Sequence, residues 1–175
     1  MGDQGYHRVE AACGLAMELA DQKALSVLNN RRFFGTVFRE GDVLLAADTI
    51  VLSPGGRLLG QPVDVGDARG MLMELAGRTH TVITGIALYR LLADGGVGGL
   101  GFTKVQQLAD QTLVIFPSLG DEVIGELLEP SFWKGKAGGY NLAQLGHLSI
   151  RTVGDPTTVV GLPMQKLRQI LPPGC

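Results

Sequence analysis

The N-terminal part of the chain carries a helical pattern of apolar and polar positions. Small and apolar residues recur there at spacings of three and four, at Val9, Ala12, Ala16, Leu19, Ala20 and Ala24. This spacing gathers the side chains on one face of an α-helix. The pattern therefore predicts a helix from about Tyr6 to Leu28 with one face buried.

Four later segments carry the pattern of strands. Residues 43–52 form a nearly continuous apolar run, and the turn sequence Ser53-Pro54-Gly55-Gly56 closes it, as expected of a buried strand. Residues 79–92 alternate as a mostly buried strand does, and residues 105–116 predict a second long strand. A shorter strand is expected over residues 147–153.

Capping residues mark the helices between these strands. Asp64, with Asp67 three residues later, is expected to cap a short helix that runs to Leu75. Gly77 follows as a left-handed stop.

Two more helices are predicted further along the chain. Ser118 with Asp121 is a capping signal for a helix that reaches Glu129 and that Pro130 ends. Pro163 suits the first position of a terminal helix that runs to Leu171. This order of helices and strands predicts the α/β or mixed α+β class, in a single domain over residues 1–175.

Composition excludes several classes of protein. Apolar residues make up 45% of the chain and charged residues 18%, and the formal net charge is -2. These values argue against disorder and against a nucleic acid polymer as partner, so an anionic ligand must be held by a local site. The chain has no apolar stretch of membrane-spanning length, and its N-terminus lacks the regions of a signal peptide. We therefore expect a cytoplasmic protein without a membrane partner.

Asp48 is the charged residue within the apolar run of residues 43–52. Burying an isolated carboxylate costs several kcal/mol unless hydrogen bonds or a cation offset the loss of water. One interpretation is that Asp48 belongs to a functional site. The other is that it lies at the end of the strand and caps a turn through Thr49, and the pattern does not separate the two.

Lys136 lies in a glycine-rich segment, Gly135-Lys136-Ala137-Gly138-Gly139. Flanking glycines allow backbone N–H groups to point at anionic oxygens, and the ammonium adds a positive charge, which suits a phosphate site. The alternative is a glycine-rich turn with an incidental lysine.

Three other polar residues also have ordinary structural explanations. Lys23, late in the first helix, is typical of a solvated surface lysine. Arg78 follows a helix stop, where a positive charge complements the helix dipole. His80 is typical of a packed strand histidine.

A glycine motif also occurs at Gly96-Val97-Gly98-Gly99-Leu100-Gly101, which spells GxGxxG. A dinucleotide site requires a helix after this motif, but a strand-like run follows it here. We therefore favour the tip of a hairpin.

Several of these segments, taken in order, resemble the Maf family of nucleoside triphosphate pyrophosphatases. The matching segments are Ala20–Ala24, Ala46–Thr49, Gly77–His80, Lys136–Tyr140, Leu145–Gly146 and Val159–Pro163. The resemblance covers about residues 6–171 and implies a Maf-like, ITPase-like fold, which is an elongated mixed sheet flanked by helices.

The resemblance also implies that the opening of the family pattern is missing. Maf proteins begin with a strand and a Ser-x-Ser-Pro-Arg-Arg loop that grips phosphates, and this chain starts after both. We therefore expect the first strand of the sheet to be missing. Three explanations are open: the start was misassigned, the chain is a fragment, or the chain is a degenerate member of the family. The last explanation predicts instability or compensation by a homodimer, since an unpaired strand edge is left open.

The resemblance assigns a role to each candidate residue. Asp48 is the expected catalytic base and metal ligand. The expected substrate-binding residues are Lys23, Thr49, Arg78, His80, Lys136 and Gln144. The expected cofactor is a divalent cation, Mg²⁺ first and Mn²⁺ second. The expected substrate is a nucleoside triphosphate, with dTTP and UTP favoured, which water cleaves to the monophosphate and pyrophosphate.

The chain departs from the family pattern at three places. Gln61 stands where the family has the lysine of Gly-Lys-Pro, Gly135 stands where an aspartate precedes the lysine, and Gln144 lies one place beyond the family's glutamine. These departures favour an alternative, a catalytically impaired nucleotide-binding or regulatory protein linked to septum formation. A plain structural α/β protein is a further alternative, and it predicts no stabilisation by nucleotides.

Overall fold

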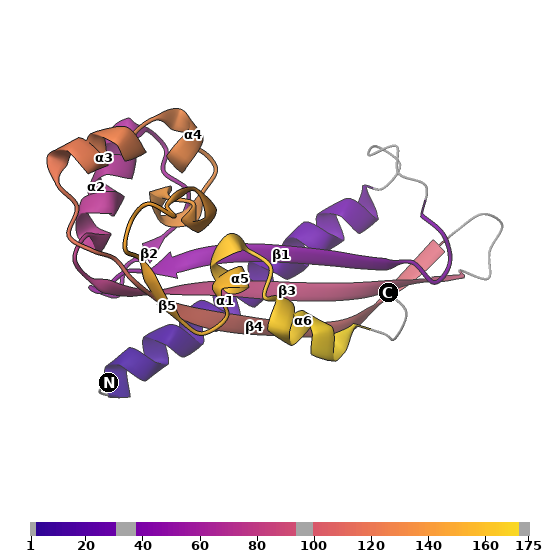
Figure 1. Cartoon of the computed structure of the whole chain (residues 1–175). Helices are drawn as coiled ribbons and strands as arrows, with labels where there is room; N and C mark the ends of the chain where they lie inside the picture. The colour runs from indigo at the N-terminus through magenta and orange to yellow at the C-terminus, as the bar shows by residue number, and fades with distance from the viewer. Residues whose placement is uncertain (1–2, 31–37, 94–99, 172–175) are drawn as a thin grey trace.

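The fold is built around one five-stranded antiparallel sheet (Figure 1). The computed structural model describes residues 3–30, 38–93 and 100–171. The strands lie in the order β2-β1-β3-β4-β5, and each described pairing is antiparallel. They are β1 (Val43–Leu52), β2 (Leu58–Leu59), β3 (Thr79–Ala93), β4 (Leu100–Ile115) and β5 (Arg151–Val153).

Helices cover both faces of this sheet, which confirms the predicted mixture of helices and strands. They are α1 (Asp3–Asn29), α2 (Val65–Leu75), α3 (Asp121–Leu127), α4 (Pro130–Trp133), α5 (Pro156–Val160) and α6 (Met164–Ile170), with two 3₁₀ turns, η1 (Ala137–Gly139) and η2 (Leu142–Gln144). Figure 1 shows α1 crossing one face of the sheet and α5 and α6 lying on the other. None of the helices in the described part of the chain combines the length and the apolar character needed to cross a bilayer.

The helix α1 packs unusually close to the sheet because its buried face is made of alanines. The side chains at four-residue spacing on this face are at most 2% exposed, at Ala12, Ala16, Ala20 and Ala24. Gly85 of β3 lies directly beneath, and a Cβ atom there would be 2.2 Å from the carbonyl oxygen of Ala16. Small residues on both elements therefore set the distance between helix and sheet.

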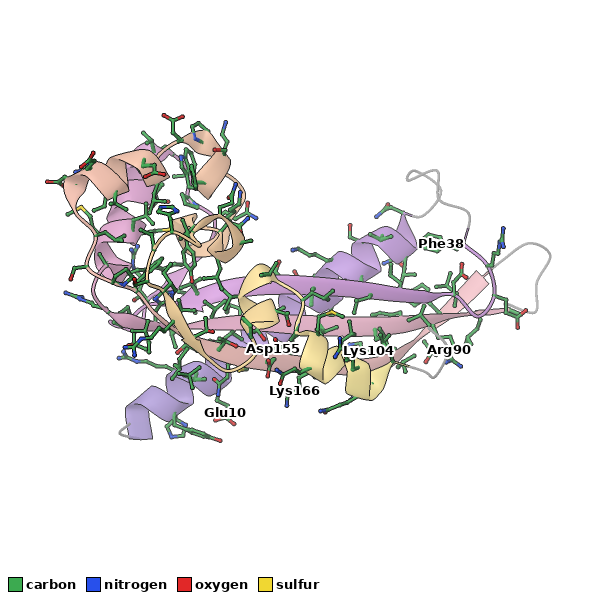
Figure 2. The ribbon with its side chains drawn as sticks, viewed as in Figure 1. Glu10, Phe38, Arg90, Lys104, Asp155 and Lys166 are labelled. Carbon is green, nitrogen blue, oxygen red and sulfur yellow. The ribbon has the colours of Figure 1, made fainter. Side chains whose placement is uncertain are left out.

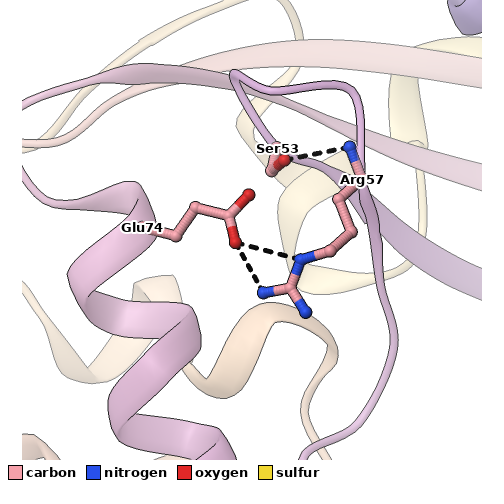
Figure 3. Close-up of polar contacts among 3 residues, drawn as sticks. All are labelled: Ser53, Arg57 and Glu74. Carbon is pink, nitrogen blue, oxygen red and sulfur yellow. Dashed lines mark hydrogen bonds and ion pairs between the residues drawn. The ribbon is translucent and has the colours of Figure 1, made fainter.

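The three helices α2, α3 and α4 gather at one end of the sheet (Figure 1). They enclose a core with the start of β3 and the end of β4, to which Leu72, Phe116 and Leu127 belong. An ion pair ties this lobe to the β1–β2 turn, since Arg57 Nη2 lies 2.5 Å from Glu74 Oε2 (Figure 3). Ser53 Oγ accepts a bond from the Arg57 backbone N–H at 3.0 Å and holds the turn.

Most element predictions are confirmed. The strand over 43–52 has the predicted bounds. The helix α1 begins three residues before its predicted start and ends one residue later, β3 is one residue longer, and β4 begins five residues early at Leu100. Asp64 caps α2 by accepting from the Asp67 N–H at 2.8 Å, and Gly77 has a φ of 68°. Residues 96–99 of the glycine motif lie outside the described residues, and the strand β4 follows them in place of a helix.

The predictions for the last third of the chain were partly wrong. Ser118 does not cap α3, which begins after Gly120 without a side-chain cap, and the helix ends at Leu127. Pro130 does not only follow a helix but also begins the short helix α4, because proline suits the first turn of a helix. The last strand is limited to Arg151–Val153. Pro163 directly precedes α6, at the N-cap position, and is not the first residue of the helix. The helix α5 was not predicted.

The strand β1 has an open edge beside the centre of the sheet. It pairs with β3 over its whole length, but on its other side β2 pairs only with Val51 and Leu52. Within the described residues, no strand covers the outer edge of residues 43–50. The candidate site lies along this edge, where residues 47–49 and Val51 of β1 line a cavity.

Candidate functional site

A cavity of about 290 Å³ lies along the open edge of β1. Residues from α1, β1, the loop before η1 and the end of α5 line it. Its polar side chains are Lys23, Asp48, Thr49, Gln61, Lys136 and Asn141, and its apolar wall includes Val51, Val82, Val159 and Val160. The volume is near the lower limit for small-molecule sites. The lining thus combines charged groups with an apolar wall, as in a site for an anionic ligand that also has an apolar part.

Asp48 lies in the middle of β1, opposite Gly85, and its side chain is 17% exposed. The interpretation of Asp48 as a turn cap is therefore wrong. Its neighbours two residues away, Ala46 and Ile50, pack toward α1, so the carboxylate lies on the same face of the strand. It forms an ion pair with Lys23 of α1, whose ammonium also donates to the Ala47 carbonyl at 3.3 Å.

Thr49 lies on the opposite face of β1 and connects three elements. Its Oγ1 lies 2.8 Å from Oγ1 of Thr84 on β3, and the Thr84 hydroxyl donates to the carbonyl of Thr158 at 2.7 Å. Thr158 is in α5, directly before Val159 and Val160 of the cavity wall. These bonds fix the end of α5 against the strand that carries Asp48.

Lys136 reaches the cavity from the glycine-rich loop. Its ammonium donates to the carbonyl of Ser131 at 2.9 Å, which leaves two of its N–H groups for other partners. Gly138 has a φ of 72°, and a Cβ atom there would lie 3.0 Å from Cγ2 of Val51. The Gly138 N–H donates to the Gly60 carbonyl at 3.0 Å, so glycine lets the loop pack tightly beside the cavity.

Tyr140 lines the cavity, and His80 lies behind it. His80 Nε2 lies 2.8 Å from the Tyr140 hydroxyl, and the two rings pack with Phe116. Burial lowers the pKa of His80 from 6.5 to about 4 and raises the pKa of Tyr140 above its usual value. His80 is therefore neutral at physiological pH and supports the floor of the cavity.

The structure gathers four of the seven sequence candidates: Lys23, Asp48, Thr49 and Lys136. The other three do not line the cavity. Arg78 is exposed after α2, His80 is buried behind Tyr140, and Gln144 is exposed on η2. The sequence candidates did not include Gln61 and Asn141. Asn141 directly follows the matching segment Lys136–Tyr140, and Gln61 is one of the departures from the family pattern.

The cavity offers few ligands of its own to a metal ion. In the described residues, no group of three His, Cys, Asp or Glu side chains is arranged to hold one. Asp48 is the carboxylate in the cavity lining. Since Mg²⁺ is commonly bound by one or two carboxylates together with phosphate oxygens of a substrate, this donor set fits a cation that arrives with a triphosphate.

Comparison with known proteins assigns the chain to a family. The family model described as "Maf-like protein" matches residues 3–173. The chain is 40% identical over 152 residues to the human "Probable bifunctional dTTP/UTP pyrophosphatase/methyltransferase protein", a match over 86% of this chain and 24% of the human protein. It therefore spans about a quarter of that relative.

Two shorter relatives are matched over most of their length. The chain is 34% identical to the "dTTP/UTP pyrophosphatase" of Pyrococcus furiosus, over 82% of this chain and 70% of that protein. It is also 34% identical to the "dTTP/UTP pyrophosphatase" of Brucella abortus, over 98% of this chain and 77% of that protein.

Proposed function

Because the chain belongs to the Maf-like protein family, we propose that it is a nucleoside triphosphate pyrophosphatase that prefers dTTP and UTP. The reaction is the attack of water on the α-phosphorus. The bond from this phosphorus to the bridging oxygen breaks, and the products are the nucleoside monophosphate and pyrophosphate.

The observation that carries this proposal is that Asp48 and two lysines line one cavity. Lys23, from α1, and Lys136, from the glycine-rich loop, both line the cavity with Asp48. Two ammonium groups suit the charge of a triphosphate, and positive groups beside the phosphates stabilise the charge that develops on its oxygens. The apolar wall of Val159 and Val160 then suits the nucleoside.

The Lys23–Asp48 ion pair gives each residue a defined part in the reaction. When phosphate oxygens draw the ammonium of Lys23 away, the Asp48 carboxylate is released to accept a proton from the attacking water. Binding of the triphosphate removes little further water from the Asp48 carboxylate, because this side chain is already largely covered. A divalent cation, Mg²⁺ or Mn²⁺, would be held by Asp48 and would supply further neutralisation of the phosphate charge when bound.

The test is pyrophosphate release from dTTP by Asp48→Asn. The amide keeps the shape of the side chain but cannot accept the proton, so we expect the rate to fall by at least about 100-fold. Asp121→Asn is the matched control, because Asp121 is 92% exposed on α3 and outside the cavity. If Asp48→Asn released pyrophosphate at the wild-type rate, the assignment would be wrong.

A second measurement separates catalysis from binding. A thermal shift of the wild-type chain with dTTP and Mg²⁺ reports binding by mass action. Binding without hydrolysis would favour the catalytically impaired, regulatory alternative and would contradict our proposal. A cytoplasmic location, a homodimer and substrate contacts of Arg78, His80 and Gln144 stay predictions.

A further inference from the structure

A chain of three threonines connects the cavity to the interior of the protein. Thr49 lines the cavity, Thr84 is 0% exposed on β3, and Thr158 is 0% exposed on α5. The Thr84 hydroxyl lies within hydrogen-bond distance of both others, 2.8 Å from Thr49 Oγ1 and 2.7 Å from the Thr158 carbonyl oxygen. The direction of each bond in this chain follows from the number of hydrogens available.

A hydroxyl group has one hydrogen to donate, and a carbonyl oxygen has none. The bond to the Thr158 carbonyl therefore uses the hydrogen of Thr84. The bond between Thr49 and Thr84 must then use the hydrogen of Thr49. With its hydrogen directed toward Thr84, the hydroxyl of Thr49, a residue of the cavity lining, keeps only acceptor positions for a further partner.

The Thr158 carbonyl that sets this direction is itself held in place. The Thr158 hydroxyl donates to Asp110 Oδ2 at 2.6 Å, which anchors this residue to β4. Gly161, at the end of α5, lies so close to Thr49 that a Cβ atom there would be 3.3 Å from Oγ1. The surroundings of the Thr49 hydroxyl are therefore fixed from two sides.

We infer that Thr84 is a positioning residue that makes Thr49 an obligate acceptor, so that the site selects a nucleotide by a hydrogen-bond donor on its nucleoside. This inference rests on the proposed function. Ionised phosphate oxygens only accept hydrogen bonds, so the triphosphate is excluded as the partner of Thr49. The nucleoside of dTTP offers two donors, the 3′-hydroxyl of the sugar and the N3–H of the base.

The test compares three substrates: dTTP, its analogue without the 3′-hydroxyl, and its N3-methyl analogue. The analogue that lacks the contacted donor leaves the Thr49 acceptor unpaired, so we expect kcat/KM to fall by about 10- to 100-fold for that analogue alone. The identity of the affected analogue tells whether the donor belongs to the sugar or to the base. Equilibrium affinities for the same three nucleotides give a readout independent of turnover.

Variants then isolate the role of Thr84. In Thr84→Val the hydrogen of Thr49 is free to turn toward the cavity. The ratio of kcat/KM between dTTP and the affected analogue should then fall to within about threefold, and Thr84→Ser should restore the larger ratio. Thr112→Val is the matched control, because the buried Thr112 also donates to an α5-side carbonyl, that of Asp155, at 2.7 Å, but does not contact Thr49. Should Thr84→Val fail to fold, Thr84→Cys carries the same test, since a thiol is a weak acceptor.

The outcomes separate this inference from the proposed function. Hydrolysis of all three nucleotides at similar kcat/KM, or discrimination that survives in Thr84→Val, would overturn the inference and leave the pyrophosphatase activity standing. The inference would also be overturned if the wild type hydrolysed the three nucleotides equally well and Thr49→Val lowered kcat/KM by the same factor for each. That result would assign Thr49 to the attacking water. Absence of both binding and hydrolysis by the wild type would refute the proposed function, and the inference with it.

Discussion

The close packing of α1 on Gly85 makes a strong prediction about stability. In Gly85→Ala the new Cβ atom would lie 2.2 Å from the carbonyl oxygen of Ala16 and 2.4 Å from the backbone nitrogen of Met17. The obstacle is helix backbone, which cannot turn aside as a flexible side chain can. The helix must therefore move away from the sheet.

The size of the movement follows from the contact distances. The distance to the Ala16 oxygen must grow from 2.2 Å to at least 3.4 Å, where ordinary van der Waals contact begins, so α1 must shift by about 1 Å. Such a shift loosens the contacts of every buried alanine along α1. Overpacking typically costs about 1–3 kcal/mol, and we expect the upper end, about 3 kcal/mol, because a whole helix is displaced.

Urea denaturation followed by two probes measures this loss. Far-ultraviolet circular dichroism reports α1, and the fluorescence of Trp133, the single tryptophan of the chain, reports the helical lobe. Coincident transitions would justify a two-state free energy. Pyrophosphate release should fall as well, because α1 carries Lys23 to its contact with Asp48.

Gly70→Ala is the matched control for this variant. Gly70 is exposed in α2, and a Cβ atom there has no heavy atom within 4 Å. Alanine is the better helix former by about 0.5–1 kcal/mol, so this variant should be slightly more stable than the wild type. An unfolding free energy of Gly85→Ala within about 0.5 kcal/mol of the wild-type value would refute the packing argument.

Three further predictions concern other parts of the fold. Burial lowers the pKa of His80 from 6.5 to about 4, so the unfolded chain alone gains this proton as the pH falls through that range. Stability should then decrease by about 3 kcal/mol between pH 6.5 and 4, and His80→Phe should reduce this slope in urea titrations; an unchanged slope would count against a neutral His80. Asp155, at the start of α5 (Figure 2), accepts bonds from the N–H groups of Thr157 and Gln165, so Asp155→Ala should lower stability by about 1–2 kcal/mol in thermal unfolding, and no change would contradict this capping role. Glu74→Gln, which breaks the ion pair with Arg57, should cost about 1 kcal/mol or less, and a larger or salt-independent loss would show that the pair is not a surface contact.

The sequence by itself determined the local helices and strands, and it singled out Asp48 as a charge within an apolar strand. Helical spacing of alanines predicted α1, and an unbroken apolar run predicted β1, because each pattern reports which side of a single element is buried. The cap at Asp64 was also predictable, since donor and acceptor lie three residues apart. Asp48 could be identified as a candidate because a charge within an apolar strand needs a partner.

Only the tertiary structure decided which partners these residues have. Lys23 and Asp48 are 25 residues apart, and they meet because α1 crosses the face of β1 at that point. Thr84 and Thr158 come together over a sequence separation of 74 residues, which no local period encodes. Gly85 appeared in the sequence as an ordinary strand residue, yet it sets the distance of α1 from the sheet. The physical reason is that a pattern along the chain reports burial, whereas direction and distance between distant segments are set by how the elements pack.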